Sequence, residues 1–243
     1  EIFAATLKYS KVVLDEIQSY SPGLIAALIY GLKMITDMGG RFAIITATLP
    51  PVIKYFMSRY GLIEGEKYVY KDFSGTNTDK RHMVDMYNGP IKTSAVIDDA
   101  RNKKVLIICN TIKSAQNIYA ELKEKCGNIH MLHSHYTKED RRMIEDSLTA
   151  FSDDVDAVGI WITTQIVEAS MDIDFDVLYT EMSTADSLLQ RMGRCNRKYR
   201  YTPETPNIHV YCTGNHTVYD KEIYQRSIDK LQSYLGAFFI EAD

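Results

Sequence analysis

Three strings hold most of the side chains in this sequence that could do chemistry. The first is Asp15-Glu16-Ile17-Gln18, the second is Thr46-Ala47-Thr48, and the third runs from Gln190 to Arg197 and reads QRMGRCNR. In chain order they offer carboxylates, small hydroxyls and guanidinium groups. Carboxylates hold divalent cations, and planar guanidinium groups bind phosphates. The set therefore indicates chemistry on a triphosphate.

The acidic pair follows the apolar run Val12–Leu14. Both carboxylates are therefore expected at the C-terminal end of a buried strand, the edge where open parallel sheets bind ligands. Such a pair can hold Mg²⁺ through water while one carboxylate polarises the attacking water. The alternative is a helix-capping or surface acidic pair.

Hydroxyl groups end two further strands. Thr46 and Thr48 could hydrogen-bond the acidic pair and relay the state of the nucleotide; the alternative is a simple turn before Pro50. Thr163 and Thr164 could bind a phosphate of a polynucleotide, as hydroxyls and backbone amides do.

Two polar positions at other strand ends suit ligand binding as well. Asn110-Thr111 opens a helix and suits a phosphate-backbone contact, with an ordinary N-cap as the alternative. Asp172 is expected to reach a ribose hydroxyl, with a solvated acidic loop as the alternative.

The arginines of the third string lie three residues apart. Arg191, Arg194 and Arg197 are expected to cluster on one side of a helix and its following loop. Guanidinium groups suit the γ-phosphate, where an arginine finger can supply much of the rate. That role requires this domain to close on a nucleotide held by another. With Lys198 and Arg200 the segment forms a basic patch, for which the alternative is a solvated loop.

Short apolar runs alternate with amphipathic segments, which predicts an α/β fold with parallel strands. The predicted strands, buried on both faces, are 11–14, 42–46, 105–109, 157–162, 177–180 and 208–212. The predicted helices are 22–38, 114–125, 138–151 and 220–239. A polar stretch at 74–80 predicts a boundary between residues 1–77, the C-terminal part of a larger domain, and residues 78–243, a complete second domain.

Composition excludes several classes of protein. The net charge of −4 gives no global support for nucleic-acid binding, so such binding depends on local patches. No apolar stretch is long enough to cross a membrane, and the four cysteines form no C-x-x-C pair, which makes zinc binding unexpected. A reduced, cytoplasmic setting fits these features.

The strings VVLDEIQSYSP, ITATLPP and TTQIVEASMDIDFDVLYTEMSTADSLLQRMGRCNR, in this order, resemble the motifs of superfamily 2 helicases. The resemblance covers essentially the whole chain. More narrowly, the chain is similar to the CRISPR-associated helicase of type I interference systems, which is usually joined to an HD nuclease.

This resemblance implies two RecA-like domains, the first truncated at its N-terminal side. It implies an ATP-dependent motor running 3′ to 5′ on single-stranded DNA, which a crRNA-guided surveillance complex recruits to an R-loop. The implied roles are Mg²⁺ binding through water by Asp15, water activation by Glu16, coupling by Thr46 and Thr48, DNA contact by Asn110, Thr111, Thr163 and Thr164, nucleotide contact by Gln18, Asp172 and Arg191, and catalysis by Gln190, Arg194 and Arg197.

The sequence departs from the family pattern at three points. Gln18 stands where many relatives have histidine, and its amide can still bridge two domains. The phosphate-binding G-x-x-x-x-G-K-[ST] loop and an HD nuclease cluster are both missing from this sequence, so we expect them upstream and expect the isolated chain to be inactive. The alternatives are another superfamily 2 RNA or DNA helicase, and a split docking subunit without catalysis.

Overall fold

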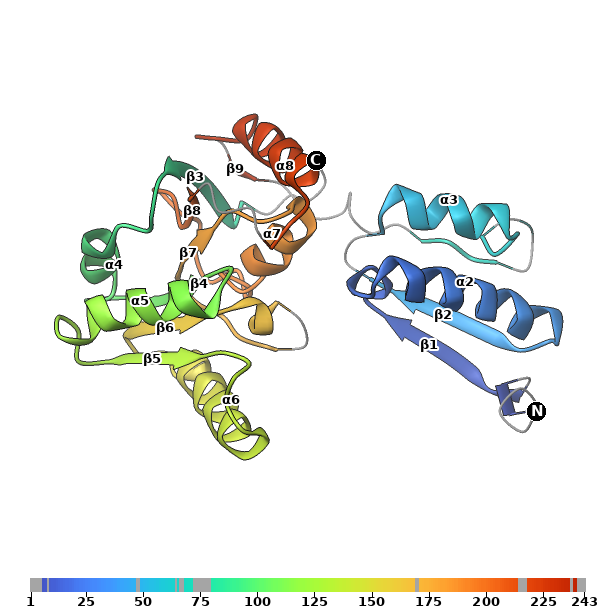
Figure 1. Cartoon of the computed structure of the whole chain (residues 1–243), viewed down its shortest axis with the longest axis horizontal. Helices are drawn as coiled ribbons and strands as arrows, with labels where there is room; N and C mark the ends of the chain where they lie inside the picture. The colour runs from blue at the N-terminus through green and yellow to red at the C-terminus, as the bar shows by residue number, and fades with distance from the viewer. Residues whose placement is uncertain are drawn as a thin grey trace. The chain divides into compact units, whose positions relative to one another are not determined.

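The chain divides into two compact units. Unit 1 comprises Glu1–Thr76 and unit 2 comprises Asn77–Asp243, a division next to the predicted boundary. The computed structural model describes residues 6–7, 9–46, 49–63, 65, 68–71, 80–168, 171–213, 218–236 and 238–239 (Figure 1). No helix among these residues is long and apolar enough to cross a membrane.

Unit 1 contains two parallel strands and a layer of helices. Strands β1 (Lys11–Asp15) and β2 (Arg41–Ile45) pair in register from Lys11 opposite Arg41 to Asp15 opposite Ile45. Its described residues also form the 3-10 helix η1 (Ile17–Ser19) and helices α2 (Pro22–Asp37) and α3 (Pro51–Arg59). Helix α2 begins at Pro22, where the sequence predicts its start, and Gly39 with φ 90° follows its end.

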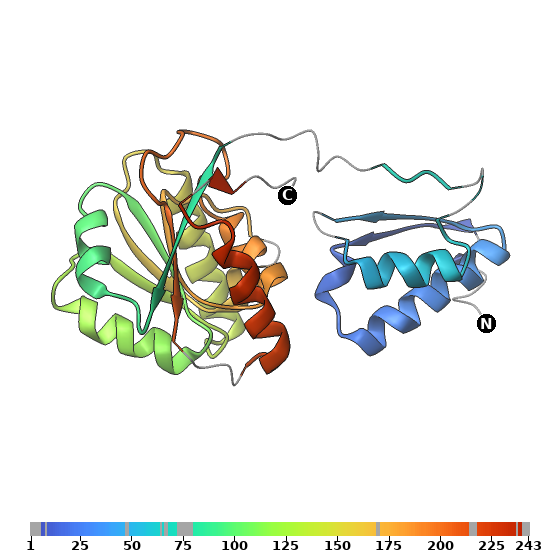
Figure 2. The same cartoon turned by 90° about the horizontal axis from the view of Figure 1, so that it is seen from above.

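The two strands of unit 1 are buried on one face only. Val12, Leu14, Phe42 and Ile44 pack against the helices, and Figure 2 shows both helices on that face of the sheet. On the opposite face Val13 is 58% exposed and Ile45 is 60% exposed. The prediction that these strands are buried on both faces is therefore wrong for the described part of unit 1, because helices α2 and α3 cover only one side.

Unit 2 is a three-layer α/β fold. Its sheet has the strand order β5-β6-β4-β7-β8-β3-β9. The strands are β3 (His82–Asn88), β4 (Lys104–Ile108), β5 (Ile129–Leu132), β6 (Gly159–Thr163), β7 (Val177–Glu181), β8 (Ile208–Cys212) and β9 (Phe238–Phe239). All pairs are parallel except β3 with β9.

Helices cover both faces of this sheet. Helices α4 (Thr93–Asp99) and α5 (Ile112–Lys123) share one apolar cluster with Val105, Ile107 and Tyr179. Helices α6 (Lys138–Asp153), α7 (Ala185–Met192) and α8 (Lys221–Gln232) share the other with Leu106, Trp161 and Leu178. Strands β4, β6 and β7 are buried at every residue, which confirms the prediction of central parallel strands.

Several elements of unit 2 differ from the sequence-based expectation. Strands β3 and β5 and helix α4 were not predicted, because their apolar runs are short or interrupted by polar residues. The predicted last helix ends at Gln232 and not at Phe239: Gly236, with φ 73°, reverses the chain, and Phe238 pairs with Met83.

Candidate functional site

The acidic pair of unit 1 stands at the predicted strand end. Asp15 is the last residue of β1 and its side chain is exposed. Glu16 leaves the sheet in a left-handed conformation, with φ 48° and ψ 53°, and its backbone N–H donates to the carbonyl of Ile45 at 2.9 Å. A non-glycine residue in this region is strained, a condition that often accompanies a functional site.

Glu16, Gln18 and Thr46 form one hydrogen-bonded group. Gln18 Nε2 donates to Glu16 Oε2, and the Thr46 hydroxyl lies 3.0 Å from the same oxygen and 2.7 Å from Gln18 Oε1. The first and second strings are therefore in direct contact, with Thr46 between the acid and the amide. Thr48 lies outside the described residues.

In unit 2 Asn110, Thr111, Thr163 and Thr164 lie at the C-terminal ends of β4 and β6, whereas Asp172 and Arg197 belong to the segments before β7 and after α7. Asn110 is nearly buried there, and its own unit uses its polar groups. Its backbone N–H donates to Glu181 Oε2 at 2.5 Å, its Nδ2 donates to the carbonyl of Met182 at 2.8 Å, and its carbonyl accepts from Gln165 Nε2 at 2.8 Å. This position therefore fixes the strand ends in place and has little left to offer a ligand in this conformation.

The hydroxyls of Thr111 and Thr163 at these strand ends also make hydrogen bonds within unit 2. Thr111 Oγ1 accepts the backbone N–H of Ser114 at 3.1 Å and caps α5, which is the alternative that the sequence left open. Thr163 is fully buried and its hydroxyl donates to the carbonyl of Ile107 at 3.3 Å. Thr164 is also buried and precedes the 3-10 helix η3 (Gln165–Val167).

The three arginines of the third string do not share one surface. Arg191 lies in the last turn of helix α7 with no exposed surface, Arg194 is buried, and Arg197 is 40% exposed. The prediction of a cluster on one side is therefore wrong. The helix ends at Met192, so the three-residue spacing does not continue as helical periodicity. Gln190, in the last turn of α7, is half-buried.

Arg191 is the centre of a buried polar network. Its Nε donates to Glu168 Oε1 at 2.8 Å, and its Nη1 donates to Thr180 Oγ1 at 2.8 Å and the Glu181 carbonyl at 2.9 Å. Its Nη2 donates to Asn110 Oδ1 and to the Tyr219 hydroxyl, both at 2.9 Å. These five contacts use the five N–H groups that a guanidinium carries.

Arg194 binds backbone carbonyls within its own unit. Its Nε donates to the carbonyl of Val167 at 2.9 Å, and its Nη2 donates to the carbonyl of Glu168 at 2.6 Å. It therefore ties the segment after β6 to the segment after α7.

Arg197 and Asp172 contact each other. Arg197 Nε lies 2.9 Å from Asp172 Oδ1, and the side chains are 40% and 77% exposed. An exposed pair of this kind contributes about 1 kcal/mol or less, so a polyanionic ligand can compete for the guanidinium. The residues predicted for the ribose and for the γ-phosphate therefore lie side by side on the surface of unit 2.

The predicted basic patch is largely neutralised. Besides the Arg191 and Arg197 pairs, Lys198 Nζ lies 3.0 Å from Asp153 Oδ1 and Arg200 Nε lies 3.3 Å from Asp174 Oδ2. The acids come from segments far away in the sequence, which is why the string alone showed only cations.

Burial shifts the pKa values of several thiols and of a histidine in unit 2. It raises the pKa of the thiols of Cys109 and Cys195. It also lowers the pKa of His133, whose ring stacks on Tyr136 with centroids 4.5 Å apart. Among the described residues there is no group of three or more metal-ligating side chains. Water-mediated Mg²⁺ binding by Asp15 needs no such group.

Four partners of the site were missed by sequence reasoning. Glu168, Asp174 and Glu181 stand inside a quoted string but were given no role, while Tyr219 stands outside these strings. Only the fold brings Glu168, Glu181 and Tyr219 to Asn110 or Arg191, and Asp174 to Arg197 and Arg200.

A parallel sheet with these strings at its strand ends is the RecA-like fold of superfamily 2 helicases. A family model described as "CRISPR-associated nuclease/helicase Cas3, C-terminal" matches residues 101–200. A protein named "CRISPR-associated nuclease/helicase Cas3" from Methanothermobacter thermautotrophicus is 30% identical over 94% of this chain and 29% of its own length. The chain belongs to the Cas3 family.

Solved structures have the same fold. The structure titled "Crystal structure of T. fusca Cas3-ADP" aligns with a TM-score of 0.80 at 18% identity, over 96% of this chain and 34% of that one. A chain of the "CRISPR RNA-guided surveillance complex, pre-nicking" aligns with a TM-score of 0.72 at 19% identity, over 91% and 35%. The chain thus spans about a third of the length of these relatives.

Proposed function

We propose that this chain supplies part of the ATP-driven motor of a type I CRISPR interference protein. The complete protein moves 3′ to 5′ along single-stranded DNA after a crRNA-guided surveillance complex has opened an R-loop, and it works with an HD nuclease domain or subunit in the cytoplasm. The observation that carries this proposal is the contact between Arg197 and Asp172. The motifs assign them to two ends of one nucleotide, and they lie 2.9 Å apart.

The residues of unit 1 act on the triphosphate. The exposed carboxylate of Asp15 offers the hard oxygen ligands that Mg²⁺ prefers, and Mg²⁺ would neutralise charge on the β- and γ-phosphates. Glu16 orients and deprotonates the attacking water. Gln18 and Thr46 hold Glu16, so a shift of Thr46 is felt directly at the base.

The residues of unit 2 divide into ligand-binding and supporting groups. Arg197 and Asp172 are accessible and bind the γ-phosphate and the ribose, with Gln190 nearby in the chain on α7. Arg194 reaches the nucleotide only if it leaves the carbonyls of Val167 and Glu168. Arg191 and Asn110 serve as supports, because their polar groups are already paired inside the unit. Thr164 stays assigned to the DNA backbone, as does Thr111, because the Thr111 hydroxyl that accepts the Ser114 N–H still has its own O–H to donate.

A test of Arg197 uses the complete protein that carries this chain. Arg197→Ala should lower the DNA-stimulated kcat for ATP by about 10³-fold or more, as loss of an arginine finger does, while ATP still binds within a few-fold of wild type. Arg142→Ala, a change of an exposed arginine on α6, is the matched control and should leave kcat unchanged. Normal turnover by Arg197→Ala would refute the proposal.

Two further measurements separate this proposal from its alternatives. The isolated 243-residue chain should show no DNA-stimulated ATP hydrolysis, because it lacks a glycine-rich loop and lysine for the β- and γ-phosphates. The complete protein should respond to single-stranded DNA more than to RNA of the same length. Stimulation by RNA alone would favour an RNA helicase.

A further inference from the structure

Asp174 is a buried carboxylate to which the proposed function gives no part. Its residue is 3% exposed, and its neighbours in the chain, Ile173 and Phe175, belong to the apolar core of unit 2. An ionised carboxylate is kept at such a position only where donors compensate for the loss of water. The donors around it are therefore informative.

Among the residues that the structure describes, the donors to its carboxylate come from one short segment. The backbone N–H of Arg197 donates to Oδ1 at 2.7 Å, and the backbone N–H of Lys198 donates to Oδ2 at 3.3 Å. Arg200 Nε lies 3.3 Å from the same Oδ2. Asp174 thus holds the backbone from which the Arg197 side chain projects.

The backbone on both sides of Arg197 is strained. Asn196 has φ 48° and Tyr199 has φ 52°, a left-handed region that asparagine tolerates and tyrosine rarely adopts. Such conformations persist only where surrounding contacts impose them. Here Asn196 Nδ2 donates to the carbonyls of Arg81 at 3.1 Å and Tyr201 at 2.7 Å.

The chain around Asp174 runs beside the arginine segment. The backbone N–H of Phe175 donates to the Arg194 carbonyl at 3.0 Å, and the Asn196 N–H donates back to the Phe175 carbonyl at 2.8 Å. Movement of one segment therefore moves the other.

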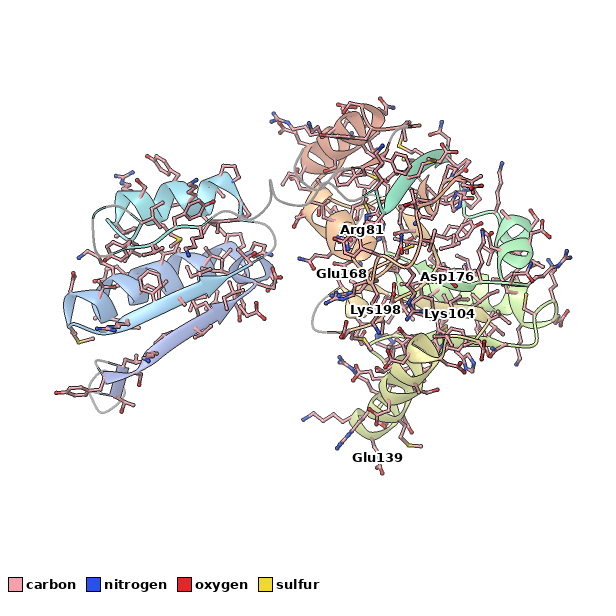
Figure 3. The ribbon with its side chains drawn as sticks, turned by 180° about the vertical axis from the view of Figure 1, so that it is seen from behind. Arg81, Lys104, Glu139, Glu168, Asp176 and Lys198 are labelled. Carbon is pink, nitrogen blue, oxygen red and sulfur yellow. The ribbon has the colours of Figure 1, made fainter. Side chains whose placement is uncertain are left out.

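A buried lysine and serine support Asp174 from behind. The backbone N–H of Asp174 donates to Ser152 Oγ at 2.6 Å, and the carbonyl of Ser152 accepts from Lys104 Nζ at 2.6 Å. Figure 3 labels Lys104 together with Asp176, whose Oδ2 accepts the Lys104 backbone N–H at 2.8 Å. The support for Asp174 therefore extends back to the start of β4.

We propose that Asp174 is the positioning residue of Arg197: it holds the backbone of the finger in place, while Asp172 holds its guanidinium tip. When a triphosphate replaces Asp172 at the tip, the base of the finger stays fixed by Asp174. This inference rests on the proposed function, because it gives Arg197 the role of finger. Asp174 itself touches neither the nucleotide nor water in the reaction.

The test is a double-mutant cycle in the complete protein. Asp174→Asn keeps the shape of the side chain but replaces one carboxylate oxygen by an NH₂ group. That group cannot accept a hydrogen bond from the backbone N–H groups of Arg197 and Lys198. It should lower the DNA-stimulated kcat by about 10²-fold, the scale of a misplaced catalytic group, with KM for ATP changed by less than about 3-fold. In the Arg197→Ala background, where residual turnover is followed with radiolabelled ATP, the same substitution should have no further effect.

The outcomes separate the two proposals. A loss of kcat of equal size in both backgrounds would show that Asp174 acts only on the fold. A wild-type kcat for Asp174→Asn, together with an impaired kcat for Arg197→Ala, would also overturn this inference and leave the proposed function standing. Normal turnover by Arg197→Ala would instead refute the proposed function. Should Asp174→Asn not fold, Ser152→Ala removes the hydroxyl bonded to the Asp174 N–H and should give a kcat loss of several-fold that likewise disappears with Arg197→Ala.

Discussion

Replacement of Arg191 by methionine, a side chain of similar length, should destabilise unit 2 severely. Arg191 is completely buried and makes five hydrogen bonds. After the change the hydroxyls of Thr180 and Tyr219 can still donate to the carbonyl of Glu181 and to Asn110 Oδ1, at 2.9 and 3.4 Å. The carboxylate of Glu168 loses its cation, and loss of one partner of a buried pair costs about 3–5 kcal/mol.

That cost can be measured in unit 2 alone. Trp161 is the only tryptophan of the chain and is 1% exposed in the core of unit 2, so its fluorescence reports the unfolding of that unit. With a urea m-value of about 2 kcal/mol/M, the midpoint for Arg191→Met should fall by roughly 1.5–2.5 M.

The matched control is Arg142→Met, the same chemical change at an exposed position on α6, which should shift stability by no more than about 0.5 kcal/mol. If Arg191→Met unfolded at the same urea concentration as Arg142→Met, the buried network around Arg191 would not stabilise unit 2.

Two further predictions concern pH and coupling. Burial lowers the pKa of His82 to about 4, so between pH 6.5 and 4 the unfolded chain binds a proton that the folded chain does not bind. The free energy of unfolding should therefore fall by about 2 kcal/mol from pH 7 to pH 5. This part of the loss should be missing in His82→Gln when Trp161 fluorescence is followed in urea. Thr46→Val, which removes the hydroxyl beside Glu16 and Gln18, should cut DNA movement per ATP hydrolysed by about 10-fold, whereas Thr36→Val, whose hydroxyl bonds only a carbonyl of its own helix, should not; equal effects of the two variants would remove Thr46 from coupling.

The strand ends could be predicted from sequence because buried parallel strands carry an unmistakable pattern. VLIIC and the runs around Trp161 and Leu178 are apolar at successive positions, and these strands are buried on both faces. The same pattern wrongly predicted that Val13 and Ile45 are buried, because a run of apolar residues does not show whether helices cover one face of the strand or both.

The site was predicted less completely than the fold. Spacing placed Asp15, Glu16 and Thr46 together, because two neighbouring parallel strands end at one edge. It grouped Arg191 wrongly with Arg197, since a guanidinium that saturates a buried network and one that faces solvent look identical in a string. The acids that pair with the basic segment come from distant segments, and only the fold identifies them.

The most direct test of the account is a structure of the complete protein bound to single-stranded DNA and a beryllium-fluoride analogue of ATP. We expect that in this structure Arg197 has left Asp172 and lies about 3 Å from the γ-phosphate position, with Glu16 facing the attacking water on the same nucleotide. If Arg197 is still paired with Asp172, and neither it nor Arg194 contacts the nucleotide, the central claim is contradicted.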